Sequence, residues 1–148
     1  MGRGYFGIGV YKPKNGENIG TLWRSANVFG ASFIFIIGAR FKKQPTDTLR
    51  TERHIPLYQY DTYQDFRNNI PHGCQMVGIE CPGKEKLASF KHPVSCLYLL
   101  GSEDNGLPQS ILDDCQNVVE VEAKRCLNVS VAGSIVMYSR SVGTNDPA

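Results

Sequence analysis

The chain has 148 residues, a formal net charge of +2 and 41% hydrophobic residues. This length allows one domain with a substantial core, and excludes a catalytic domain joined to a separate substrate-recruiting domain. No apolar run is long enough to cross a bilayer, and the first residues lack the apolar core of a signal peptide, so we expect a cytoplasmic protein without membrane contact. So small a net charge does not predict nucleic-acid binding, which must be argued from local charge.

The cysteines and histidines do not form a metal-binding or disulfide pattern. An odd number of cysteines without a CxxC pair predicts reduced thiols in the core. The histidines lie far apart, and each is close to a proline or glycine, which favours turn positions. We therefore assign no metal to this chain. The residues concerned are Cys74, Cys81, Cys96, Cys115 and Cys126, with His54, His72 and His92.

Strands and helices alternate in the predicted chain order. Aromatic and β-branched residues predict a strand at residues 4–11, and a nearly continuous apolar run predicts another at residues 31–38. Between them, residues 18–29 can form a helix that buries Leu22, Ala26 and Phe29. Further strands are expected at 57–60, 75–80, 94–100 and 117–122, with helices at 62–69, capped by Asp61 or Thr62, and at 109–115, and a loop or helical turn at 82–88.

This alternation predicts an α/β fold with a mainly parallel sheet and helices on both faces. We expect residues 1–142 to form one domain. The last segment, residues 143–148, is polar and is expected to be a disordered tail.

Residues 126–138 predict a helix with a functional end. Leu127, Val131, Ile135 and Tyr138 recur at helical spacing and predict a core face, and the small residues between them allow another backbone to approach closely. The polar residues Cys126, Asn128 and Ser130 gather at the start, where free helix N–H groups bind anions or polar ligands. A capped core helix and a ligand site both explain this segment.

Two loops carry further candidate residues. Residues 101–108 combine glycines, polar side chains and a proline directly after a buried strand, where open α/β sheets bind ligands. Residues 40–53 hold five basic residues against two acidic ones, an excess of three positive charges, with Phe41 available for stacking. A solvated loop explains this second segment equally well, but it is the best candidate for contact with a phosphate backbone, through Arg40, Lys42, Lys43, Arg50 and Arg53.

Three segments together resemble the motifs of the SpoU/TrmH branch of the SPOUT RNA 2′-O-methyltransferases. They are residues 18–30, residues 100–108 and residues 127–132, each at the predicted end of a strand or start of a helix. The resemblance implies that the sheet's C-terminal part passes through a loop to make a deep trefoil knot. It also implies a homodimer whose RNA site is completed across the interface.

The cofactor implied by the resemblance is S-adenosylmethionine, held mainly by backbone groups of three loops in the knot. In this chain the implied cofactor residues lie at three strand ends, with one more closing the adenine side. Glycines allow close approach, and an apolar adenine slot needs no charged side chain. The residues are Ile79, Glu80, Leu100, Gly101, Gly106, Val121 and Leu127.

The resemblance also assigns catalytic roles, because a ribose 2′-hydroxyl must be aligned with the methyl carbon and lose its proton. Arg24 is implied as the proton acceptor, but a guanidinium is effectively always protonated, and gripping the adjacent phosphate is an alternative role. Asn18 and Asn128 would orient Arg24 and the substrate. Glu103 would position that network or an arginine of the partner subunit, and Ser130 would cap the helix and form a hydrogen bond nearby.

The chain departs from the family pattern before the third motif. Many relatives carry serine where this chain has Cys126, and Ile-Pro-Met where it has Val121, Glu122 and Ala123. A thiol is a poorer hydrogen-bonding group than a hydroxyl, which puts any role of that serine in doubt here. Cofactor binding through the Val121 backbone needs no particular side chain and is less affected.

The leading hypothesis is 2′-O-methylation of RNA. The absence of the extra N-terminal domain of many ribosomal-RNA-directed relatives favours tRNA over ribosomal RNA as the substrate. A catalytically silent knotted RNA-binding module is the first alternative, against which the four residues Asn18, Arg24, Glu103 and Asn128 argue. A generic nucleotide-binding enzyme of the doubly wound class is the second, and it predicts binding of NAD or ATP instead.

Replacing Lys42, Lys43 and Arg50 by alanine should weaken RNA binding and flatten its salt dependence. For each phosphate that the variant no longer binds, the slope of log affinity against log salt should decrease by about one unit, because fewer counterions are released. Filter binding of tRNA over a salt series measures this slope. An unchanged slope would remove the loop from the RNA-binding surface.

Overall fold

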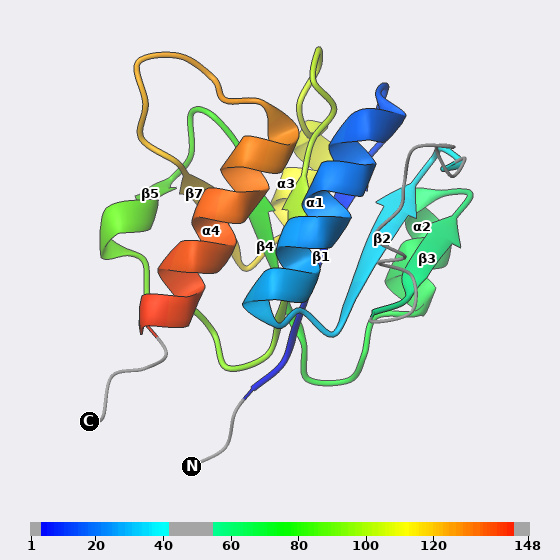
Figure 1. Cartoon of the computed structure of the whole chain (residues 1–148), viewed down its shortest axis with the longest axis horizontal. Coiled ribbons are helices and arrows are strands. Elements are labelled where there is room, and N and C mark those ends of the chain that lie inside the picture. Colours follow the sequence, from blue (N-terminus) through cyan, green and yellow to red (C-terminus); the bar gives the residue numbers. More distant parts are fainter. Residues whose placement is uncertain (1–3, 42–54, 144–148) are drawn as a thin grey trace.

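The computed structural model of the chain describes residues 4–41 and 55–143 (Figure 1). Its strands are β1 (Phe6–Tyr11), β2 (Phe33–Ile37), β3 (Leu57–Tyr60), β4 (Gln75–Ile79), β5 (Glu85–Lys86), β6 (Cys96–Leu100) and β7 (Asn117–Glu120). Its α-helices are α1 (Gly16–Phe29), α2 (Tyr63–Asn68), α3 (Gln109–Asp114) and α4 (Val129–Gly143), and a 3₁₀ turn covers Leu87–Ser89.

The strands form one seven-stranded sheet in the order β3-β2-β1-β6-β4-β7-β5. All of its strand pairings are parallel. The helices lie on both sides of this sheet (Figure 1), so the predicted fold class is confirmed. The trefoil knot implied by the resemblance stays a prediction.

The central strands β1, β2, β4 and β6 are buried on both faces of the sheet, which explains their nearly continuous apolar sequences. Strand β6 contributes Tyr98 and Leu100 to a core that also holds residues of α1 and α4. Its alternate residues Leu97 and Leu99 belong to a second core, which includes Phe66 of α2 and residues of α3. The parallel arrangement brings the carboxyl ends of β4, β6 and β7 to one edge of the sheet.

Helices α1 and α4 lie side by side on one face of the sheet (Figure 1). Gly133 permits this approach, because a Cβ atom at this position would lie only 2.6 Å from Cδ1 of Leu22. The contact between the two helices includes one polar pair, because the hydroxyl oxygens of Ser134 and Ser25 lie 2.8 Å apart. The expectation that small residues admit a close neighbour is therefore correct for this helix.

The expected core face of α4 is wrong. Val131, Ile135 and Tyr138 are 46%, 38% and 58% exposed, and Leu127, just before the helix, is 37% exposed. The buried face instead carries Val129, Ser130, Ala132, Gly133, Val136, Met137 and Arg140. The helix carries apolar residues on two sides, and the side with Ala132 and Gly133 packs inward because α1 and the sheet come so close.

Helix boundaries differ from the prediction at functional positions. Helix α1 begins at Gly16 behind the N-cap Asn15, whose Oδ1 accepts a hydrogen bond of 2.8 Å from the backbone N–H of Glu17, so Asn18 lies inside the first turn. Helix α4 begins at Val129, so Cys126 precedes it. Of the two caps predicted for α2, Thr62 is the one observed.

Three smaller expectations differ from the structure. Short strand β5 lies in the segment predicted as a loop or helical turn. The cysteines are not all core residues: Cys96 is buried, but Cys81 and Cys126 are exposed. Gly143, placed in the tail by the sequence, is the last residue of α4, and residues 144–148 lie outside the described part.

Membrane spans and metal clusters are both absent from the described part of the chain. Among residues 4–41 and 55–143, no helix has the length and apolarity that a bilayer span requires. Within the same ranges, no three or more His, Cys, Asp or Glu side chains gather in a way that could hold a metal ion.

A buried polar cluster lies where α4 passes the amino end of β6. Arg140, 5% exposed, donates to the carbonyl oxygens of Pro93 and Val94 at 2.7 and 2.8 Å. His92 lies 2.7 Å from the Tyr98 hydroxyl through Nδ1 and 3.0 Å from the Ser139 hydroxyl through Nε2. Burial, and then the positive charge of Arg140, lower the pKa of His92 to about 4.

This lowered pKa predicts acid sensitivity. As the pH falls from 6.5 to about 4, the unfolded chain takes up a proton at His92 that the folded protein does not, so the free energy of unfolding decreases. Urea unfolding at a series of pH values should show a shallower decrease for His92→Gln. His72→Gln, at an exposed residue, is the matched control, and equal slopes for wild type and His92→Gln would contradict the prediction.

Candidate functional site

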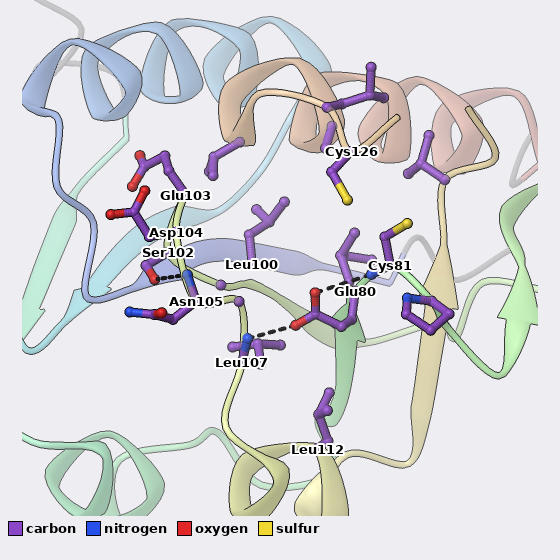
Figure 2. Close-up of a pocket in the computed structure, with 18 of the residues that line it drawn as sticks. Glu80, Cys81, Leu100, Ser102, Glu103, Asp104, Asn105, Leu107, Leu112 and Cys126 are labelled. Carbon is purple, nitrogen blue, oxygen red and sulfur yellow. Dashed lines mark hydrogen bonds between the residues drawn. The ribbon is translucent and has the colours of Figure 1, made fainter. Parts of the chain in front are cut away.

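A cavity of about 540 Å³ lies at the carboxyl ends of β4, β6 and β7, against the start of α4 (Figure 2). Its size is in the range of small-molecule sites. All seven residues expected to hold the cofactor line it, namely Ile79, Glu80, Leu100, Gly101, Gly106, Val121 and Leu127. These residues come together because parallel strands present their carboxyl ends on the same edge.

The loop after β6 forms one wall and requires glycine at two positions. A Cβ atom at Gly101 would lie 2.2 Å from the carbonyl carbon of Gly106, so the loop could not fold back on itself. Gly106 has a φ of 65°, a left-handed conformation that favours glycine. The backbone of this loop is therefore brought directly to the cavity.

Glu80 joins two walls of the cavity through its side chain. Its Oε2 accepts a hydrogen bond of 2.6 Å from the backbone N–H of Leu107, and its Oε1 accepts one of 3.1 Å from the N–H of Cys81 (Figure 2). The carboxylate thus ties the loop after β6 to the end of β4. The sequence placed Glu80 here through its strand-end backbone and gave no sign of this contact.

A chain of side-chain hydrogen bonds connects the three motifs. Nδ2 of Asn18 donates to Oε1 of Glu103 at 2.9 Å, and Nδ2 of Asn128 donates to Oδ1 of Asn18 at 3.0 Å. Oδ1 of Asn128 in turn accepts from the backbone N–H groups of Ser130 and Val131 at 2.9 and 3.3 Å. Glu103, which also lines the cavity, is thereby linked to the start of α4.

The groups around Glu103 favour the ionised form of its carboxyl group. Burial raises the pKa of its carboxyl group, but the hydrogen bond from Asn18, backbone N–H groups and the charge of Lys14 outweigh burial and lower the pKa below its ordinary value. The backbone N–H of Lys14 donates to Oε2 at 3.2 Å, and Nζ of Lys14 pairs with Asp104. Lys14 was not among the predicted site residues, although its place shortly after the first strand puts it at the same edge of the sheet.

The expected cap of α4 is wrong. Asn128, and not Ser130, caps this helix, since the Asn128 side chain accepts the free N–H groups of the first turn. Ser130 is 5% exposed, and its hydroxyl donates to Oδ1 of Asn128 at 2.6 Å. A buried hydroxyl must find a partner, and the neighbouring cap provides it.

Arg24 lies apart from this hydrogen-bond chain. Six residues after Asn18 on α1, it points about 120° away from Asn18 around the helix axis. It is not one of the cavity-lining residues, and its guanidinium is 3.5 Å from the Thr21 hydroxyl. The residue Val28, four positions later, is 76% exposed, so Arg24 lies towards the outer side of α1.

The candidate RNA-binding residues lie mostly outside the described part. Arg40 is described, and its guanidinium is 3.4 Å from the Asp61 carboxylate in an exposed pair. Such a pair contributes little to stability and leaves the arginine accessible to another partner. Lys42, Lys43, Arg50 and Arg53 lie outside the described residues.

Relatives of this chain include tRNA-modifying enzymes. Over 132 residues it is 26% identical to the tRNA (guanosine(18)-2′-O)-methyltransferase TARBP1 of Mus musculus, which covers 82% of the chain and 8% of the relative. Over 144 residues it is 25% identical to the tRNA (guanosine(18)-2′-O)-methyltransferase of Saccharomyces cerevisiae. This match covers 90% of the chain and 10% of the yeast protein. The chain therefore spans a tenth or less of the length of these two relatives.

Solved structures share its fold. The SpoU methyltransferase AviRb of Streptomyces viridochromogenes, in complex with AdoMet, superposes with a TM-score of 0.85 at 19% identity and covers all of this chain and 61% of its own. A protein solved for insight into 2-OH methylation of C/U34 on tRNA gives a TM-score of 0.83 at 20% identity. The superposition covers 97% of this chain and 98% of that protein.

The family follows from a match along most of the sequence. The model of the SpoU rRNA Methylase family matches residues 6–138, a range that includes all three motifs and every strand of the sheet. The resemblance inferred from those motifs is thereby confirmed. This protein belongs to the SpoU rRNA Methylase family.

Proposed function

We propose that this protein transfers a methyl group from S-adenosylmethionine to a ribose 2′-hydroxyl of tRNA. The observation that carries the proposal is the cavity at three strand ends, bordered by the Glu103–Asn18–Asn128 hydrogen-bond chain. Family membership supports it, as do the activities named for the mouse and yeast relatives. Ribosomal RNA as substrate and a catalytically silent RNA-binding module are the alternatives.

The cavity suits S-adenosylmethionine. Ile79, Leu100, Val121 and Leu127 offer an apolar slot for adenine, and backbone groups at the strand ends can meet its polar edge. The cofactor has no phosphate, so a glycine-rich phosphate loop is not needed. When bound, it supplies an electrophilic methyl group on a sulfonium sulfur.

The protein's own groups would position the ribose. Glu103 is ionised, borders the cavity and can accept a hydrogen bond from a hydroxyl, which would align the 2′-oxygen. Asn18 and Asn128 would act through Glu103, since each holds the next member of the chain in place. Their role is therefore positioning, and this role does not require a contact with Arg24.

Arg24 would anchor a phosphate next to the target ribose. A guanidinium grips phosphate through paired hydrogen bonds and does not accept a proton at neutral pH. Because Arg24 lies towards the outer side of α1, it is better placed to act on RNA held at the cavity of a partner subunit. This supports the implied arrangement in which two subunits complete one RNA site.

The exposed face of α4 supports a homodimer. Val131, Ile135, Tyr138 and Val142 lie at spacings of four, three and four residues, and each is at least 38% exposed. Their spacing puts them on one side of α4 as an apolar surface, which a second copy of the chain would cover. We propose that this face is the dimer interface and that the enzyme works in the cytoplasm.

Replacing Arg24 by alanine should abolish methyl transfer while leaving the affinity for S-adenosylmethionine within a few-fold. The reason is that Arg24 does not line the cavity but would hold the RNA phosphate. Transfer of labelled methyl to tRNA, together with calorimetry of cofactor binding, separates the two effects. Arg67→Ala, at an exposed arginine of α2 on the other face of the sheet, is the matched control.

The outcomes distinguish the alternatives. If Arg24→Ala lost methyl transfer and cofactor binding equally, Arg24 would act at the cofactor and not at an RNA phosphate. Binding of S-adenosylmethionine by the wild type without transfer to any RNA pool would favour the silent module. Transfer to ribosomal RNA but not to tRNA would identify the other substrate, and binding of NAD or ATP instead would favour a generic nucleotide enzyme.

Introducing glutamate at both Val131 and Tyr138 should dissociate the dimer, because two carboxylates would be buried in an apolar interface. Sedimentation should then show a monomer. Methyl transfer should decrease together with the fraction of dimer if Arg24 acts across the interface. Val94→Glu, at a residue 67% exposed outside α1 and α4, is the control. A double variant that stays dimeric would place the interface elsewhere.

A further inference from the structure

Two exposed thiols line the cavity from segments far apart in the sequence. Cys81 lies two residues beyond the end of β4, and Cys126 lies between β7 and α4. Both belong to the cavity lining, and their sulfur atoms point into the same region of it (Figure 2). The proposed methyl transfer uses neither thiol.

The two thiols are neighbours. Interaction with the Cys126 thiol is the largest cause that raises the pKa of Cys81, ahead of desolvation and of the carboxylates of Glu120 and Glu80. Each of the other three cysteines, Cys74, Cys96 and Cys115, lies outside the cavity lining and is buried or half-buried. Cys81 and Cys126 are therefore an accessible pair.

We propose that Cys81 and Cys126 form a reversible disulfide that closes the cofactor cavity. The bond would join the end of β4 to the segment before α4, across the space that a ligand must enter. The identity of the excluded ligand, S-adenosylmethionine, rests on the proposed function; the bond itself does not.

The segment that carries Cys126 can accommodate the bond. A disulfide requires the two Cβ atoms to lie about 3.5–4.5 Å apart. Residues 121–128 contain no helix or strand, and residues 122–128 are exposed, so this segment can shift without breaking the sheet or α4. The shift would move Leu127, which lines the cavity, together with Asn128, which caps α4.

The reaction needs an oxidant, for which a small-molecule disulfide such as oxidised glutathione is sufficient. The Cys126 thiolate attacks one sulfur of oxidised glutathione and releases one glutathione. The Cys81 thiolate then attacks the Cys126 sulfur of the mixed disulfide and releases the second. The two cysteines lose two electrons and two protons, and one oxidised glutathione becomes two reduced molecules.

The raised pKa of Cys81 bears on the order of the two steps. The Cys126 thiol, desolvation and the carboxylates of Glu120 and Glu80 raise the pKa of Cys81, so its thiolate is less populated than that of an ordinary cysteine. Cys81 therefore fits the second step, in which the mixed disulfide is already next to it. A dithiol reductant would reverse both steps and reopen the cavity.

The test compares reduced and oxidised full-length protein. After treatment with oxidised glutathione and alkylation of free thiols, peptide mapping should find Cys81 linked to Cys126. Equilibrium dialysis with labelled S-adenosylmethionine should show binding at least about tenfold weaker than in the reduced protein, restored by dithiothreitol. Excess S-adenosylmethionine should slow the crosslink, because it occupies the cavity that both thiols line.

Single variants provide the controls. Cys126→Ser, which lacks the thiol that attacks oxidised glutathione, should bind S-adenosylmethionine with the same affinity before and after oxidant treatment, whatever that affinity is. Cys81→Ser, which cannot complete the second step, should carry a glutathione adduct on Cys126 in the peptide map. Cys74→Ser, outside the cavity lining, should keep the full response to oxidant. Loss of the response in Cys74→Ser would overturn the assignment of the pair.

Two results would overturn the proposal directly. The first is a peptide map that contains only glutathione adducts or other cysteine pairs. The second is a Cys81–Cys126 crosslinked protein that binds S-adenosylmethionine as tightly as the reduced form. Failure of the reduced protein to bind the cofactor would instead overturn the proposed function, and the peptide map, which needs no ligand, would still decide whether the bond forms.

Discussion

The candidate site depends on one directional chain of hydrogen bonds. An ionised Glu103 can only accept, so Asn18 must present its Nδ2 to it and turn its Oδ1 towards α4. Asn128 must then donate through its own Nδ2, which leaves its Oδ1 for the free N–H groups of α4. The charge of one carboxylate therefore determines the orientation of two amides and the capping of a helix that is distant in the chain.

Much of the cavity could be predicted because strand ends are visible in a sequence. Buried parallel strands appear as apolar runs, and their carboxyl ends must meet at one edge, so Leu100, Gly101 and Val121 could be assigned to the edge where they line the cavity. The side-chain contacts of Glu80 and Lys14 could not be predicted. They depend on partners 27 and 89 residues away, Leu107 and Glu103, whose positions only the fold defines.

Helix α4 illustrates why periodicity can identify a helix and still assign the wrong face. Val131, Ile135 and Tyr138 are apolar and recur at helical spacing, and spacing alone makes them the core face. The packed side is instead chosen by Gly133, where the distance to Leu22 leaves no room for a Cβ atom. Large apolar residues then remain on the outside of the helix. Their exposure is informative about how two copies of the chain assemble.

The strand order has a consequence for synthesis of the protein. Strand β1 pairs on one side with β2, which follows closely, and on the other with β6, whose pairing begins at Cys96 opposite Phe6. A ribosome that adds about 5–20 residues per second leaves this second edge of β1 open for on the order of ten seconds. An open apolar edge is an aggregation hazard, so the nascent chain is most exposed to aggregation during that interval.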